Sequence, residues 1–391
     1  MKKIFLVSGE TSGDLYAAGI AAGLQRLAAA DGDGLELSGM GGERSREAGI
    51  KLLVDSTELG VMGVVEVFTH IFSIASAFRK LVRAAEAERP DAVILIDYPG
   101  FNLELAKALW KRRIPVIWFV SPQVWTWKKY RIRKLEKYCS RMLVIFPFET
   151  EVYAPTALPT EFVGHPLLDI VAARRDPSLA RDPDLVLLLP GSRFMEITRL
   201  LTPMLETVRE LAFRHPALRF ELAAPREKIA NKCAEIIAAF RHRRPDMPEI
   251  KITVGQTSRG QQTAIAGLAA SGTVTVESAI AGLPLVVVYK MNLITILIAA
   301  VLVRLYRGFF TMVNVILNRC VFEEFLQYEV RPSNLVPALE RILPGGARRS
   351  EVEAGMDELR RDLSVNGKTD ALANAAASVY GFIKGNQNDV R

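Results

Sequence analysis

The sequence predicts an α/β protein of two Rossmann-like domains, whose parallel sheets face one another across a cleft. Three observations predict this fold. Apolar strand-like runs alternate with helical patterns along the chain, as in parallel sheets covered on both faces. The alternation pauses at 169–184, a segment rich in Asp, Arg and Pro that we interpret as a linker, and then starts again. The 391 residues also exceed what one ordinary core contains.

The first domain is expected to span 1–168. Short apolar runs predict its strands at 4–7, 93–96, 116–120, 143–146 and 162–163. Apolar residues at helical spacing predict helices from Asp14, over 74–85 and over 102–112. Asp14 would be the N-cap of the first of these helices.

The second domain is expected to span 169–345. Its strands are predicted at 185–189, 220–223, 252–254 and 285–289, with a long amphipathic helix over 196–213. The helix before the last strand should end just before Gly282, which lies past its C-terminus and is soon followed by Pro284. Residues 346–391 are helical in composition and are expected to pack back on the first domain.

The composition indicates a globular protein with an anionic partner. Half of the residues are hydrophobic, and the formal net charge of +7 favours nucleic acid, a membrane surface or a phosphorylated small molecule. Cys139, Cys233 and Cys320 are odd in number and widely spaced, which fits neither a disulfide framework nor a zinc site. We therefore expect a reducing compartment, and neither a metal ion nor a cofactor.

Four segments bear on export or membrane contact. The most apolar run, 294–303, is well short of the ~20 residues that cross a bilayer, and 4–7 is shorter than the apolar part of a secretion signal. The segment 125–137 combines aromatic residues with lysines and arginines, and 61–74 is unusually apolar. The basic segment suits an anionic membrane interface or RNA, and a solvated helix face is the alternative.

Four glycine- and serine-rich stretches lie at the ends of apolar strand-like runs, at 8–14, 96–100, 189–193 and 270–273. Ligands of open α/β sheets bind beyond the carboxyl ends of the strands. Helix N-termini at that edge offer free N–H groups and partial positive charge to phosphate. The four stretches therefore predict a site for a phosphorylated substrate.

Arg193 follows Gly191 and Ser192, and its guanidinium could hold a diphosphate through two parallel hydrogen bonds. The alternative is an ordinary turn with a solvated arginine. The run 271–277 resembles a second anion-binding helix start, in which Glu277 could accept hydrogen bonds from a ribose. A capped helix with a surface glutamate is the alternative there.

Asp97 ends an apolar strand and could act as a general base, its pKa raised by the apolar surroundings. A turn-forming aspartate is the alternative. Glu10 and Asp14 flank Ser12 and Gly13 in the first loop, and either carboxylate could contact a sugar hydroxyl. His165 is interpreted as a structural histidine.

Several strings together resemble the lipid-A-disaccharide synthase family of inverting GT-B glycosyltransferases. They lie, in chain order, at 8–14, 60–67, 97–102, 121–127, 146–149, 164–166, 189–193 and 271–277. The resemblance implies that UDP-2,3-diacylglucosamine and 2,3-diacylglucosamine 1-phosphate are joined to a β-1,6-linked lipid A disaccharide 1-phosphate, with release of UDP. It also implies a cytoplasmic enzyme attached to the inner face of the inner membrane.

By this resemblance Asp97 is the catalytic base, with Glu10 as a second catalytic residue. The substrate- and UDP-binding residues that it implies are Ser12, Gly13, Gly191, Ser192, Arg193, Ser271, Gly272, Thr273, Glu277 and Asn314. Its expected partners are the donor, the acceptor and an anionic membrane surface, without nucleic acid, and a homodimer is left open.

Two other functions compete with this interpretation. Another GT-B enzyme that uses UDP-N-acetylglucosamine, such as an epimerase or a peptidoglycan glycosyltransferase, would share the two domains but would not need the apolar segment 61–74. A non-catalytic basic protein could bind RNA or membranes through 125–137, but it would leave the four glycine-rich strand ends without a use.

Overall fold

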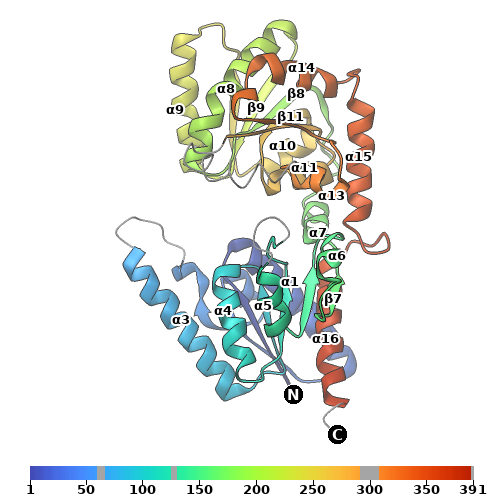
Figure 1. The fold of residues 1–391 in the computed structure, drawn as a ribbon. Helices are drawn as coiled ribbons and strands as arrows, with labels where there is room; N and C mark the ends of the chain where they lie inside the picture. The colour runs from blue at the N-terminus through green and yellow to red at the C-terminus, as the bar shows by residue number, and fades with distance from the viewer. Residues whose placement is uncertain (60–66, 125–129, 291–307, 389–391) are drawn as a thin grey trace. The chain divides into compact units, whose positions relative to one another are not determined.

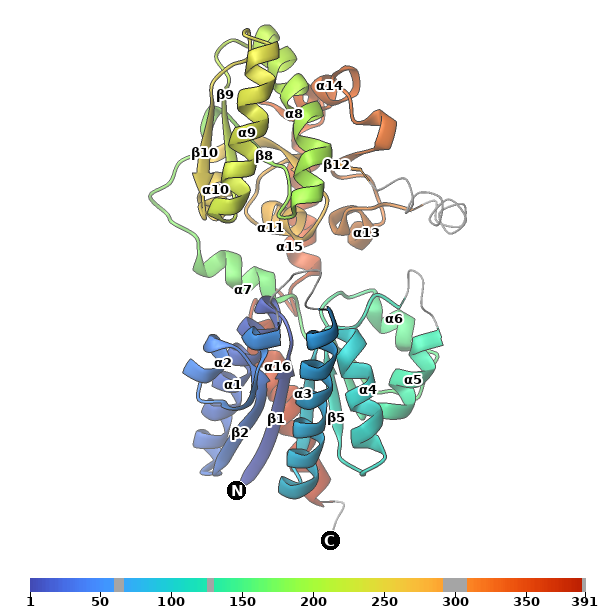
Figure 2. The same ribbon diagram turned by 90° about the vertical axis from the view of Figure 1, so that its left-hand side faces the viewer.

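The computed structural model of the chain describes residues 1–59, 67–124, 130–290 and 308–388 (Figures 1 and 2). The chain divides into two compact units. The first contains 1–166 together with 363–391, and the second contains 167–362. Each unit has its own parallel sheet, as the alternating sequence pattern predicts.

The sheet of the first unit has seven parallel strands. They are β1 (Lys2–Ser8), β2 (Leu35–Gly41), β3 (Lys51–Asp55), β4 (Ala92–Ile96), β5 (Val116–Phe119), β6 (Arg141–Val144) and β7 (Thr160–Phe162). Their spatial order is β3-β2-β1-β4-β5-β6-β7, and every pair is parallel. The order reverses at β1 and β4, so the loops that follow these two strands meet at one edge, where open sheets bind ligands.

Helices cover both faces of this sheet (Figures 1 and 2). They are α1 (Thr11–Asp31), α2 (Glu43–Glu47), α3 (Val67–Glu88), α4 (Pro99–Trp110), α5 (Tyr130–Tyr138), α6 (Glu149–Tyr153) and α16 (Ala371–Asn388). Helix α16 packs on α1, where the chain has glycine: a Cβ at Gly23 would lie 2.6 Å from that of Ala376. The missing side chain therefore allows the C-terminal helix to dock.

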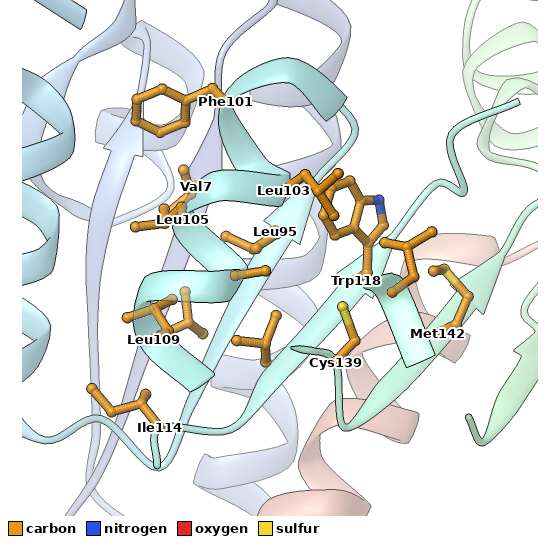
Figure 3. Packing of buried hydrophobic residues seen from close by; sticks show 14 of the residues in the cluster. Val7, Leu95, Phe101, Leu103, Leu105, Leu109, Ile114, Trp118, Cys139 and Met142 are labelled. Carbon is orange, nitrogen blue, oxygen red and sulfur yellow. The ribbon is translucent and has the colours of Figure 1, made fainter. Parts of the chain in front are cut away.

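The core between α4 and the sheet carries the strand ends of interest. Figure 3 shows Leu103 of α4 beside Trp118 of β5, and Leu105 of the same helix beside Val7 of β1. Trp118 is fully buried, and Cys139 lies in the same cluster. Burying apolar side chains contributes roughly 1.5–3 kcal/mol each, so this cluster holds β4, β5 and α4 together firmly.

The sheet of the second unit has six parallel strands. They are β8 (Asp182–Leu189), β9 (Arg219–Ala224), β10 (Ile250–Val254), β11 (Ala264–Ala270), β12 (Leu285–Tyr289) and β13 (Glu323–Leu326), in the order β10-β9-β8-β11-β12-β13. The helices of this unit are α7 (Pro166–Ala173), which begins at the last residue of the first unit, α8 (Phe194–Arg214), α9 (Glu227–Arg243), α10 (Thr257–Thr263), α11 (Thr273–Ile280), α13 (Met312–Leu317), α14 (Pro332–Ile342) and α15 (Arg349–Asp362).

The interpretation of 169–184 as a linker is wrong at both ends. Helix α7 extends to Ala173, and β8 already begins at Asp182. Helix α7 begins before the charged segment, where the buried Leu167 and Leu168 give it an apolar side.

The segment 346–391 does not return to the first unit as a whole. Helix α15 belongs to the second unit, where Val352, Met356 and Leu359 are buried. The Arg360 guanidinium also donates hydrogen bonds to the last carbonyl groups of α11. Only the chain from Leu363 onward, with α16, belongs to the first unit.

Asp14 is not the N-cap of its own helix, because α1 begins at Thr11. Its buried carboxylate instead accepts hydrogen bonds from the backbone N–H groups of Gly42 (2.6 Å), Arg44 (3.1 Å) and Ser45 (3.2 Å). Asp14 thus satisfies the first N–H groups of α2, the neighbouring helix. None of the helices in the described ranges is long and apolar enough to cross a bilayer.

Candidate active site

Strained backbone gathers where β4 and β5 leave the first sheet. Asp97 and Tyr98 follow β4 with φ of 46° and 49°, and Val120 follows β5 with φ of 67°. Left-handed backbone costs of order 1–3 kcal/mol at residues other than glycine, and β-branched valine is among the least suited to it. Since β4 and β5 are neighbours, the three strained residues lie at one edge of the sheet.

Two buried side chains hold these turns. Asn102, in the first turns of α4, is fully buried, and its Nδ2 donates to the carbonyl oxygens of Ile96 (3.2 Å) and Asp97 (2.7 Å). The Trp118 Nε1 donates to the carbonyl oxygen of Val120 at 2.9 Å. Each hydrogen bond gives a partner to a backbone carbonyl group at these turns.

A pocket of about 310 Å³ opens at these strand ends, within the first unit. Its lining residues are Asp97, Pro99, Val120, Ser121, Pro122, Gln123, Val124, Arg131, Phe146 and Glu149. The pocket combines apolar walls with three charged side chains. A cavity of this size accommodates a small ligand rather than a few water molecules.

The pKa of Asp97 is raised to about 6, first by burial and second by the negative charge of Glu10. A hydrogen bond from the Tyr98 backbone opposes part of this shift. A carboxyl group with this pKa is ionised at neutral pH and still binds a proton far better than an ordinary aspartate. This is the property that general-base catalysis needs.

Glu10 reaches this position through two close approaches of the backbone. It is the exposed N-cap of α1, directly after Gly9. A Cβ at Gly9 would lie 2.5 Å from Cδ1 of the Tyr98 ring, and one at Gly13 would lie 3.1 Å from Cβ of Ser8. Gly13 therefore brings α1 onto the sheet, and Ser12 beside it is exposed.

In the second unit, the turn before α8 contains Gly191, with φ of 110°, and the exposed Ser192 and Arg193. The Arg193 side chain is 80% exposed and donates to Oε1 of Glu196 at 3.0 Å. Oε2 of Glu196 accepts the Ser192 N–H at 3.3 Å. A carboxylate of the chain itself therefore occupies part of this helix N-terminus, as an anion would.

The second predicted helix start lies nearby. Helix α11 follows β11, which is the neighbour of β8, so α8 and α11 begin at the same edge of this sheet. Ser271 is half-buried, whereas Gly272 and Thr273 are exposed at the start of the helix. Burial raises the pKa of Glu277, and the nearby Arg174 charge opposes the shift.

Asn314 has its hydrogen-bonding groups engaged inside the second unit. Its Nδ2 donates to the Phe322 carbonyl (2.7 Å) and to Glu324 (2.8 Å), and its Oδ1 accepts the N–H groups of Val321 and Phe322. The side chain is fully buried. In this structure Asn314 holds the turn between α13 and β13, and a role toward a nucleotide would be to position this turn.

Sequence reasoning did not single out three residues that the structure places at the first site: Asn102, Arg131 and Glu149. Asn102 and Glu149 lie in the motifs 97–102 and 146–149. Sequence spacing, however, does not reveal which groups a buried side chain contacts after folding. Arg131 was counted within the basic segment 125–137, and its position in the pocket separates it from that set. Residues 61–66 and 125–129 of the expected membrane segments lie outside the described residues.

His165 is buried, which lowers its pKa to about 3, and its ring lies 5.0 Å from that of Phe146. A neutral histidine packed on an aromatic ring agrees with the structural interpretation. Within the described ranges, no group of three or more His, Cys, Asp or Glu side chains could hold a metal ion.

Comparison with known proteins yields one family and one fold. A family model described as lipid-A-disaccharide synthetase matches residues 4–378. The lipid-A-disaccharide synthase of Solibacter usitatus is 36% identical over 98% of both chains, and that of Coxiella burnetii (strain Dugway 5J108-111) is 35% identical over 98% of this chain and 99% of its own.

Solved structures resemble the chain at lower identity. The UDP-GlcNAc 2-epimerase of Neisseria meningitidis, bound to UDP-GlcNAc, matches with a TM-score of 0.60 and 11% identity over 98% of this chain and 100% of its own. A calicheamicin glycosyltransferase matches with a TM-score of 0.58 and 15% identity over 98% of each chain. At these identities the likeness concerns the fold, which is that of GT-B enzymes.

Proposed function

Because the chain belongs to the lipid-A-disaccharide synthase family of glycosyltransferases, we propose that it joins UDP-2,3-diacylglucosamine to 2,3-diacylglucosamine 1-phosphate. The acceptor 6-hydroxyl oxygen attacks the anomeric carbon of the donor from the face opposite the diphosphate. The bond from that carbon to the diphosphate oxygen breaks, and UDP leaves with the electron pair. The product is a β-1,6-linked disaccharide 1-phosphate, and the configuration at the anomeric carbon is inverted.

The observation that carries this proposal is the buried carboxylate of Asp97, with a pKa of about 6, in a pocket at the strand ends of the first unit. The attacking hydroxyl must lose its proton as the new bond forms. Asp97 accepts this proton in the proposed reaction, and Glu10 raises its affinity for it. Glu10 would thus contribute to catalysis by raising the proton affinity of Asp97, in addition to any contact of its own with the substrate.

The UDP half of the donor is assigned to the second unit. The turns before α8 and α11 lie at one edge of its sheet, and both offer helix N-termini to phosphate. Arg193 would exchange its contact with Glu196 for the diphosphate, and its charge would stabilise the leaving group as the bond breaks. Glu277 is assigned to the ribose. The Neisseria epimerase, which has this fold, was solved with UDP-GlcNAc bound.

Attachment to an anionic membrane surface is part of the proposal, since both substrates carry acyl chains. Exposed aromatic and basic side chains lie together on α4 and α5. Lys134 lies 5.7 Å from the centre of the Tyr130 ring, and Lys137 lies 4.9 Å from that of Trp110. Both rings are exposed. Such pairs suit the headgroup region, where aromatic rings and cations both find partners.

We expect Asp97→Asn to lower turnover by about 10²–10⁴, the usual contribution of a general base. Asparagine is the variant of choice because it is nearly isosteric and tolerates the left-handed backbone at this position. UDP release is measured with both substrates, and calorimetry with UDP on the same preparation is the control. Turnover close to that of the parent would show that another group takes the proton.

A different pattern is expected for Arg193→Lys, in which UDP binding and turnover both fall. A lysine keeps the charge but not the planar fork, so UDP binding weakens and turnover falls further still, because charge on the leaving group grows in the transition state. Arg214→Lys, at the far end of the same helix, is the matched control, since Arg214 pairs with Glu210 of its own helix and with Glu340 of α14. If Arg193→Lys equals this control in UDP affinity and turnover, the diphosphate binds elsewhere.

Vesicle sedimentation tests the membrane contact. Replacing Arg133 and Lys134 together by glutamine removes two exposed charges from α5. At about 1 kcal/mol each, binding to anionic vesicles at low salt should fall by roughly 30-fold. The same double change at Arg241 and Arg243 of α9 should have little effect. Equal losses in the two double variants, or equal binding of the parent to neutral vesicles, would contradict attachment through α5.

A further inference from the structure

One side chain of the first-unit pocket has no role in the reaction proposed above. Arg131 is the second residue of α5, one turn before Leu135, which is fully buried. The two share a helix face at i and i+4. Arg131 is half-buried and lines the pocket, whereas Arg133, Lys134 and Lys137 of the same helix are exposed.

The charges of the pocket make Arg131 distinctive. Asp97 and Glu149 contribute two carboxyl groups, and Glu149 is almost completely buried. Arg131 is the cation among the lining residues that the structure describes. Over the same described ranges, no carboxylate lies within ion-pair distance of its guanidinium, in contrast to Arg193, Arg348 and many other arginines of the chain. A guanidinium at the wall of a pocket, without an anion of its own, is available to an anionic ligand.

We propose that Arg131 binds the phosphate group of the acceptor, a phosphomonoester on the sugar, and so selects phosphorylated over unphosphorylated acceptors. The inference rests on the proposed function, because it takes the pocket beside Asp97 as the acceptor site. The carboxylates of Asp97 and Glu149 repel a dianionic phosphate. Within the pocket the phosphate would therefore bind beside the Arg131 guanidinium. The sugar hydroxyl groups then face the carboxylates, which accept hydrogen bonds from them.

The geometry of the groups explains why an arginine serves here. Its planar fork matches two phosphate oxygens with parallel hydrogen bonds, and it keeps its charge in a half-buried position. The donor diphosphate is a different anion with a different place, since Arg193 and the helix starts assigned to it belong to the second unit. Arg131 therefore contributes specificity for the acceptor and takes no part in proton transfer.

The test compares two acceptors, 2,3-diacylglucosamine with and without its 1-phosphate. Release of UDP is measured in nonionic detergent, so that no lipid headgroup supplies phosphate. The parent should prefer the phosphorylated acceptor. Arg131→Gln should lose about 100-fold in kcat/KM for it, as expected for charge-assisted hydrogen bonds, and little for the acceptor without phosphate. For the phosphorylated acceptor, the kcat/KM of Arg131→Lys should lie between those of the parent and of Arg131→Gln.

Arg133→Gln is the matched control, because it removes the same charge from the exposed side of α5. It should leave the ratio of the two kcat/KM values unchanged. The proposal is overturned if Arg131→Gln lowers kcat/KM equally for the two acceptors, or if the variant keeps the parent's preference for the phosphorylated one. In the second case a loss of binding to anionic vesicles would assign Arg131 to lipid headgroups instead. A parent that releases no UDP with either acceptor would refute the proposed function itself.

Discussion

The amide group of Asn102 is the contact on which the candidate active site depends. Its two hydrogen bonds to the carbonyl oxygens of Ile96 and Asp97 hold a backbone that has turned left-handed at the end of β4. The apolar cluster around Trp118 also stabilises this turn, because it fixes α4, β4 and β5 to one another. A carboxylate at this turn is therefore held at the pocket wall by the core of the unit rather than by a flexible loop.

This arrangement is unfavourable for stability and favourable for chemistry. Burial and the Glu10 charge disfavour the ionised form of Asp97, so at neutral pH the folded chain carries a carboxylate that would be more stable in water. A strained turn is added to that cost. Active sites commonly combine such features, and stability elsewhere in the fold offsets them. Here the packed sheet and its helices supply it.

Much of the fold could be predicted from the sequence, because central parallel strands are buried on both faces and read as apolar runs, as in 93–96 and 285–289. The strand 35–41 was missed, since serine and glycine interrupt its apolar character. Gly39 is needed there because its backbone approaches Leu6 of β1 too closely for a side chain. The helical character after 345 was recognised, but composition assigned all of 346–391 to the first domain, whereas α15 belongs to the second unit.

For the candidate site, residue type and strand-end position led to the predictions for Asp97 and Arg193, and their roles stay predictions. Spacing could not show that Asn102 holds the turn, that Glu196 occupies the helix start beside Arg193, or that Asn314 is engaged within its own unit. Each of these depends on contacts between segments brought together by folding. The charge of Glu10 acts on Asp97 for the same reason: β1 and β4 are neighbours in the sheet although the two residues are far apart in the chain.

The most direct test of this account is a carbon-13 NMR titration of the Asp97 carboxyl carbon, assigned by its loss in Asp97→Asn and followed without substrate. In the parent, the account predicts a pKa of about 6. In Glu10→Gln the pKa should fall toward the ordinary aspartate value, because the ionised form is no longer opposed by a neighbouring negative charge. An ordinary pKa in the parent, or a raised one that does not respond to Glu10→Gln, would contradict it.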